Sequence, residues 1–127
     1  MPIPVKVISR KNPIDNSVKY YMTNCSAGYV GLEDVAKQIE KISTVSSADI
    51  KAVLDSLQHV VIENLKNGLS VRLGDLGSFR ATLTSKGVAS KDDAAVNLIR
   101  GIHVAFTKSA TMAKELAVGN VTFNRTE

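Results

Sequence analysis

The side chains in this sequence that could do chemistry are mainly cations on strand-like segments. Residues 68–106 hold five cations against three acids, a balance of +2; these are Arg72, Arg80, Lys86, Lys91 and Arg100 against Asp75, Asp92 and Asp93. Arginine and lysine on extended segments can donate hydrogen bonds to phosphate groups, and a nucleic-acid binder that uses a β-ribbon carries its charge in this way. A generic solvated surface is the alternative, because a net charge of +4 over 127 residues is modest.

Charge is distributed unevenly over the rest of the chain. Residues 1–30 hold four cations against one acid, a balance of +3, and residues 107–127 hold three against two, a balance of +1. Residues 31–67 hold four cations against six acids and are therefore acidic, with a balance of −2. The isoelectric point of about 9.3 thus comes from the segments outside residues 31–67.

Groups that could serve catalysis or bind a metal are few and scattered. His59 and His103 have no carboxylate at metal-ligand spacing, and Cys25 has no second thiol with which to form a disulfide or a metal site. Gly74 and Gly77 lead into a strand-like segment, whereas a phosphate-binding loop leads into a helix. The sequence therefore predicts no enzyme activity, no metal, no cofactor and no small-molecule substrate.

Length and composition favour one globular domain, or one domain with an appended hairpin. The hydrophobic content of 44% is typical of a folded protein. No apolar run approaches the length of a membrane span, and the first residues lack the apolar core of a signal peptide. We therefore expect a soluble cytoplasmic protein that does not enter a membrane.

The first thirty residues predict a β-hairpin. Alternating segments 3–10 and 18–24 are joined by a run of turn-forming residues at 11–17. Val5, Val7, Tyr20 and Met22 suit one face of the hairpin, and Lys6, Ser9 and Lys19 suit the solvent face.

Two helices are expected next. The first is predicted over residues 32–42, with acids in its first turn. The second is predicted to begin after Ser46, which with Asp49 resembles a capping box, and to end at residues 66–68. Its apolar stripe consists of Ile50, Val53, Leu54, Leu57, Val61 and Leu65, and Val60 and Ile62 widen it. So much apolar surface on a small helical pair predicts a partner chain.

The helices must then be followed by strands that position the cations. Segments 69–73 and 78–84 read as strands around a sharp turn between Gly74 and Gly77. Residues 85–96 are small and lack periodicity, and residues 98–106 return as a strand in which Gly101 is a candidate bulge. Ser109 is expected to cap a short helix that reaches Leu116, and a last strand is expected at 121–124.

This order of elements, with the turn Asp75-Leu76-Gly77-Ser78-Phe79, resembles the bacterial histone-like HU and integration host factor family over residues 31–118. That family usually has an aromatic residue where this chain has Leu76. The opening Met-Pro-Ile-Pro resembles the N-terminal extension of HU-like proteins from Bacteroides-type bacteria. An ordinary hairpin in an unrelated α+β domain is the alternative to this resemblance.

The resemblance implies an α+β, HU-like fold: a helical hairpin dimer core and a β-sheet saddle with extended arms, carrying an added N-terminal β-hairpin. It implies an extension over residues 1–30 and a DNA-binding domain over 31–127. The expected function is sequence-independent binding of double-stranded DNA by a homodimeric architectural protein of the nucleoid. The expected phosphate or groove contacts are Arg72, Arg80, Lys86, Arg100 and Lys108.

The sequence departs from the family at the expected arm tip. The family's tip carries a proline that wedges between base pairs, but the three prolines of this chain lie at positions 2, 4 and 13. Asp92 and Asp93 instead place two acids near the tip, and the family's Phe-x-Pro-Gly-Lys entry to the last helix is altered to residues 106–110, Phe-Thr-Lys-Ser-Ala. A dimeric protein-interaction module with weak or no DNA binding is therefore the main alternative, and an unrelated small enzyme is a more distant one.

Overall fold

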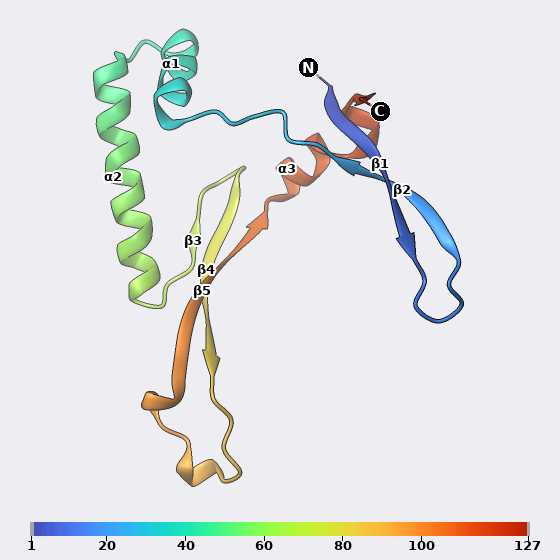
Figure 1. Ribbon diagram of the computed structural model, residues 1–127. Helices are drawn as coiled ribbons and strands as arrows, with labels where there is room; N and C mark the ends of the chain where they lie inside the picture. The colour runs from blue at the N-terminus through green and yellow to red at the C-terminus, as the bar shows by residue number, and fades with distance from the viewer. Residues whose placement is uncertain (1, 127) are drawn as a thin grey trace. The chain divides into compact units, whose positions relative to one another are not determined.

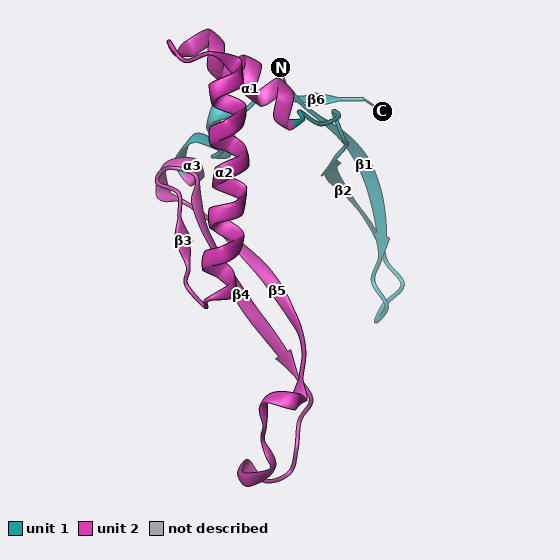
Figure 2. Cartoon of the chain, turned by 90° about the vertical axis from the view of Figure 1, so that its left-hand side faces the viewer, with its two compact units in different colours: residues 1–31, 114–127 teal, residues 32–113 magenta. Residues whose placement is uncertain are grey.

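The computed structural model describes residues 2–126, which form a mixed α+β chain with two compact units (Figures 1 and 2). Unit 1 comprises residues 1–31 and 114–127, and unit 2 comprises residues 32–113. The division into an extension over residues 1–30 and a domain over residues 31–127 remains a prediction. The compact units are divided differently at the C-terminal end, because residues 114–127 belong to the same unit as the N-terminal segment.

Unit 1 is built on a three-stranded sheet with the order β2-β1-β6. β1 (Ile3–Lys11) pairs antiparallel with β2 (Val18–Asn24) and parallel with β6 (Phe123–Arg125). The loop between β1 and β2 closes through Asn12 N–H, which donates to the Ser17 carbonyl at 2.8 Å, and Asn16 adopts the left-handed conformation with φ 61°. Asparagine has a short polar side chain and tolerates the left-handed conformation better than most residues. Asn16 therefore suits its position in this turn.

The register of β1 and β2 decides which side chains share a face. Val7 lies opposite Met22 and Ser9 lies opposite Tyr20. The predicted face of Val5, Val7, Tyr20 and Met22 therefore forms, and Ser9 lies on this same face. The placement of Ser9 on the solvent face with Lys6 was therefore wrong, because alternation puts Lys6 on the opposite face from Ser9. The last strand begins two residues later than predicted, since residues 118–120 form a 3₁₀ turn first.

Unit 2 opens with the two predicted helices, and both predictions are confirmed. α1 spans Leu32–Ile42 and α2 spans Ser47–Lys66. The Ser46 hydroxyl accepts a hydrogen bond from the Asp49 N–H at 3.3 Å, as the capping pattern predicts. Gly68, with φ 79°, follows the C-terminal end of α2 and lets the chain leave the helix.

The second sheet has the order β3-β4-β5. β3 (Val71–Arg72) is shorter than predicted, because Leu69 N–H donates to the Asn64 carbonyl of α2 and Leu73 N–H donates to the Gly77 carbonyl. β4 (Gly77–Ser85) and β5 (Ile99–Lys108) form a long antiparallel pair. Its register shifts between Thr84 and Ser85, which leaves Arg100 without an opposite residue beside the predicted bulge at Gly101.

The segment between β4 and β5 is an arm that holds two 3₁₀ turns, Lys91–Asp93 and Val96–Leu98 (Figure 1). The first turn is capped by the Ser90 hydroxyl, which accepts from the Asp92 N–H at 3.3 Å. Local serine capping thus orders a segment whose sequence shows no helical or strand periodicity.

The base of the sheet is fixed to α3 (Ala110–Glu115) through Ser109. The Ser109 hydroxyl donates to the Asp75 carbonyl and accepts from the Met112 N–H at 3.0 Å. The predicted helix cap is therefore confirmed, and the same hydroxyl holds the turn before β4 against the start of α3.

The core of the described chain is small. Among the described hydrophobic residues only Ala36 and Ile50 are buried, with 1% and 5% of their surface exposed. No helix within residues 2–126 is long and apolar enough to cross a membrane.

Candidate nucleic-acid interface

Two of the predicted cations share the polar face of the β3-β4-β5 sheet. Phe79, Ala81 and Leu83 lie opposite Phe106, Val104 and Ile102, and these pairs form the apolar face. Arg80 alternates with them and so lies on the other face, together with Arg72, whose register partner is Ser78. Both arginines are exposed, so the sheet presents one apolar and one basic face.

Lys108 joins these arginines at the base of the sheet. Arg72 and Lys108 line one cavity of about 180 Å³, together with the polar groups of Ser78, Thr107 and Ser109. Arg80 Nη1 lies 3.5 Å from Thr107 Oγ1, so its guanidinium group lies beside a residue that lines this cavity. We call Arg72, Arg80 and Lys108 the base cluster.

Lys86 and Arg100 form a second group where the arm leaves the sheet, here called the arm pair. Lys86 N–H donates to the Leu98 carbonyl at 2.8 Å, and the neighbouring residues Ser85 and Ile99 are paired. The five predicted cations therefore occupy two places on one unit, three at the base of the sheet and two at the root of the arm.

None of these five cations takes part in a salt bridge with another residue of the described chain. The salt bridges found there join Lys51 to Glu33 and Lys66 to Glu63 on the helices. Asp75, the acid closest in sequence to the base cluster, accepts a hydrogen bond from the Thr111 hydroxyl at 3.2 Å. The charges of the base cluster and arm pair are thus available to an external anion.

The arm tip has a different chemistry. Lys91, Asp92 and Asp93 are exposed in one 3₁₀ turn, so a polyanion that reached the tip would meet two carboxylates. Val96 at the second turn is 83% exposed and is the most exposed large apolar side chain of the arm. The tip therefore combines an acidic turn with an apolar one.

The histidines and the cysteine are not gathered into a site. His59 lies on α2 and His103 on β5, and both are exposed. Cys25 is half-buried, with Sγ 3.8 Å from Thr126 Oγ1. Among residues 2–126 no group of three histidine, cysteine, aspartate or glutamate side chains could hold a metal ion.

A helical pair followed by a three-stranded sheet, whose two long strands continue into an extended arm, defines an HU-like protein. The chain belongs to the HU-HIG family, described as an HU domain fused to wHTH, Ig or a glycine-rich motif, which matches residues 1–125. The recognition of an HU-like family from the sequence is thereby confirmed. No curated protein matches the sequence.

Two solved structures show similar folds. One is a proposed bacterial DNA-binding protein from Bacteroides vulgatus, with a TM-score of 0.68 and 15% identity over 98% of this chain and 48% of that one. The other is HU of Anabaena in a cocrystal with DNA, with a TM-score of 0.53 and 18% identity over 68% of this chain and 96% of that one. The chain thus spans about half the length of the Bacteroides protein, whose fold it shares across both units.

Proposed function

We propose that the chain binds double-stranded DNA without sequence specificity, as an architectural protein of the nucleoid. The observation that carries this proposal is the separation of faces on the β3-β4-β5 sheet. Arg72 and Arg80 lie on the polar side, and Lys108, at the end of β5, lines the same cavity as Arg72. The base cluster has no salt-bridge partner among the described residues, and the arm pair extends the positive charge toward the arm. Membership of the HU-HIG family supports the same function.

Contacts of this kind position DNA through its phosphates and carry no sequence information. Arginine and lysine displace condensed counterions from the duplex, and the release of those ions supplies the free energy of binding. A wedge that kinks the duplex is not part of the proposal, because the arm has no proline and its tip carries Asp92 and Asp93. Affinity should therefore depend strongly on salt and weakly on base composition.

The apolar side of the same unit supports a homodimer. Val53, Val60 and Ile62 of α2 expose 64%, 50% and 55% of their surface, which is unusual for a helix of a soluble monomer. A cavity of about 390 Å³ separates Ile62 and Leu65 from the apolar face of β4 and β5, and a second of about 290 Å³ is lined by Leu57, Val61 and Phe79. A second copy of the chain is the proposed occupant, because the HU-like fold implies a core shared between two helical hairpins.

Residues 1–30 are proposed to form an N-terminal hairpin added to an HU-like domain over 31–127. The exposed β1–β2 hairpin supports a separate role for this segment, since its cations are on a different unit from the base cluster.

A dimeric protein-interaction module with weak or no DNA binding is the second candidate. The acidic turn at Asp92 and Asp93 favours it, because two carboxylates at the arm tip oppose a phosphate backbone.

Titration of a random and an A·T-rich duplex of equal length tests the proposal. Association with both at low ionic strength, with equal affinity within about threefold, supports architectural DNA binding. The absence of association with either duplex at low ionic strength would favour the protein-interaction module.

A further inference from the structure

The β1–β2 hairpin of unit 1 has a basic face that the proposed function does not use. Arg10 lies directly opposite Lys19, and Lys6 lies opposite Thr23 on the same face. Ile8 and Tyr21 form the pair between them. Three cations therefore line this face over a length of roughly 13 Å, at about 3.3 Å per residue. The opposite face carries Val5, Val7 and Met22, so polarity is separated here as it is on the larger sheet.

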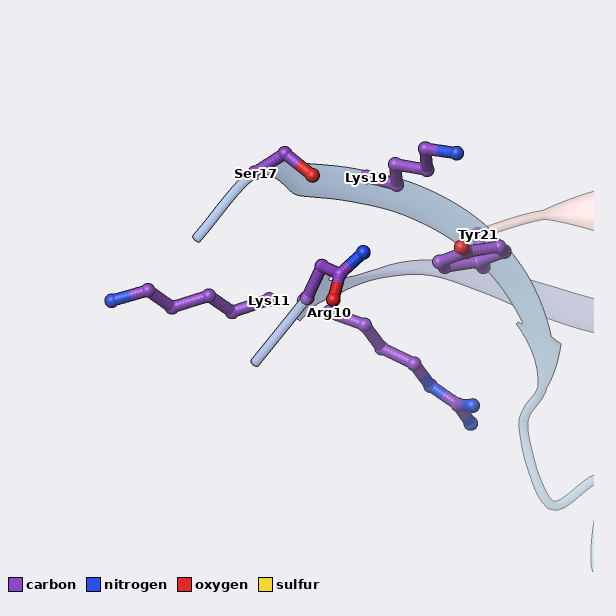
Figure 3. A pocket seen from close by; sticks show the side chains of 6 residues that line it. Arg10, Lys11, Ser17, Lys19 and Tyr21 are labelled. Carbon is purple, nitrogen blue, oxygen red and sulfur yellow. The ribbon is translucent and has the colours of Figure 1, made fainter. Parts of the chain in front are cut away.

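The loop end of this face holds a cavity of about 210 Å³ lined by Arg10, Lys11, Asn12, Ser17, Lys19 and Tyr21. Figure 3 shows Arg10 and Lys11 on one strand, Lys19 and Tyr21 on the other, and Ser17 just before the second strand begins. The Arg10 guanidinium carbon lies 5.8 Å from the centroid of the Tyr21 ring, a distance at which the ring attracts and orients the cation.

Arg10 and Lys19 form an unfavourable pair in the absence of an anion. Like charges directly opposite each other in an antiparallel ladder destabilise it. Neither residue takes part in a salt bridge within the described chain. A bound anion would relieve the repulsion between the two side chains. The pair is therefore better explained as a binding site for an anion than as a contribution to the stability of the hairpin.

The acid of the loop does not neutralise these cations. Asp15 Oδ1 accepts hydrogen bonds from the Ser17 N–H at 3.0 Å and from the Ser17 hydroxyl at 2.7 Å. Both bonds lower the pKa of Asp15, and the bond from the Ser17 backbone N–H has the larger effect. Asp15 is thus a structural element of the loop, and the nearby cations remain available to an external partner.

We infer that the basic face of the β1–β2 hairpin, formed by Lys6, Arg10 and Lys19, is a second surface that binds the phosphate backbone of duplex DNA. The cations are spread along a strand, which suits a row of phosphates better than a single phosphate ion. Phosphates of one DNA strand advance by about 3.4 Å along the helix axis, so the face spans roughly four nucleotides. The inference rests on the proposed function, because the partner is the same duplex.

The test compares duplex affinity across salt for the full chain and three double variants. Arg10→Ala/Lys19→Ala removes the facing pair. Lys37→Ala/Lys41→Ala removes the same charge from α1, where both lysines are exposed, and is the matched control. Arg10→Lys/Lys19→Arg keeps both charges and shows whether charge rather than a particular side chain is needed. Circular dichroism and melting curves confirm that each variant is folded.

The hairpin variant is expected to lower the slope of log K against log salt by roughly two, at about 0.9 per phosphate. If the variant and the wild type bind equally at 1 M salt, this corresponds to a loss of roughly 60-fold in affinity at 0.1 M salt. The control and the charge-preserving variant should retain the wild-type slope. If the wild type binds and the hairpin variant matches the control, the second surface is refuted and the proposed function stands. If the wild type does not bind duplex DNA at low salt, both are refuted.

Discussion

Gly77 and Thr107 pack so closely across the β4–β5 ladder that a β-carbon on Gly77 would overlap the Thr107 carbonyl oxygen. The same atom would lie 2.8 Å from a ring carbon of Phe106. Gly77 also has φ 147°, a conformation that side chains disfavour. The glycine at this turn is therefore required by both its backbone angle and the space around it.

Gly77→Val should destabilise the protein by at least about 1–3 kcal/mol, since strain and overlap act together. The measurement is the free energy of unfolding in urea. Gly87→Val is the matched control, because a β-carbon on Gly87 would meet no other atom within 4 Å. This variant should change stability by less than about 0.5 kcal/mol. Equal midpoints for wild type and Gly77→Val would contradict the packing described here.

Leu57→Asp should disrupt the proposed homodimer. Leu57 lines the apolar cavity between α2 and Phe79, so a dimer would bury an unpaired carboxylate there at a cost of several kcal/mol. Sedimentation velocity at micromolar concentration should show a dimer for the wild type and a monomer or an unfolded chain for the variant.

Ala52→Asp is the control for the dimer prediction. Ala52 is exposed on α2, about 200° around the helix from Ile50, and thus lies opposite the apolar stripe. This variant should remain dimeric. A folded, monomeric wild type at micromolar concentration would eliminate the homodimer.

The loop of the β1–β2 hairpin should contribute stability that depends on pH. The pKa of Asp15 is lowered in the folded state, first by the backbone N–H of Ser17 and then by its hydroxyl. Asp15 therefore stabilises the fold fully above its ordinary pKa near 3.8, and this contribution is lost as pH falls through the lower, folded-state pKa.

Ser17→Ala removes only the hydroxyl, so the pKa of Asp15 should rise partway toward its ordinary value. A carboxyl-detected NMR titration measures this pKa directly. No change in the pKa would mean that the Ser17 hydroxyl does not bind Asp15 in solution.

The elements with local signals were predictable from sequence, and those set by register were not. The cap at Ser46 and the exit at Gly68 lie beside the helix they bound, so α2 could be placed from its own residues. β6 has three residues and pairs with β1 across more than a hundred positions, for example Phe123 with Ile3, and no local pattern indicates that partner.

The candidate site shows the same division. The five cations could be selected because they follow the family pattern, but the convergence of Arg72 and Lys108 on one cavity depends on the β3-β4-β5 register. The facing pair of Arg10 and Lys19 was missed for the same reason, since only the hairpin register places them opposite each other. The one signal in the sequence that could have found this pair is the length of the loop at residues 11–17, because the loop length sets the register of the two strands.

Asp92→Asn/Asp93→Asn should tighten DNA binding if the arm tips approach the backbone. Removal of two negative charges from an exposed turn lowers repulsion by phosphates, and a gain of a few-fold in affinity at low salt is expected. Glu40→Gln/Asp55→Asn makes the same charge change on the helices and should have a smaller effect. Equal effects of the two double variants would show that the arm tip stays away from DNA.

The most direct test of DNA binding through phosphates is the salt dependence of duplex affinity for the wild type and for Arg80→Ala/Arg100→Ala. Arg80 lies in the base cluster and Arg100 in the arm pair, so the variant weakens both groups and leaves the apolar pairs of Phe79, Ala81 and Leu83 unchanged. For the wild type, log K should fall linearly with log salt by roughly 0.9 per phosphate neutralised. The variant should remain folded with a slope reduced by roughly two. A wild-type slope near zero, or an identical slope in the folded variant, would contradict the account.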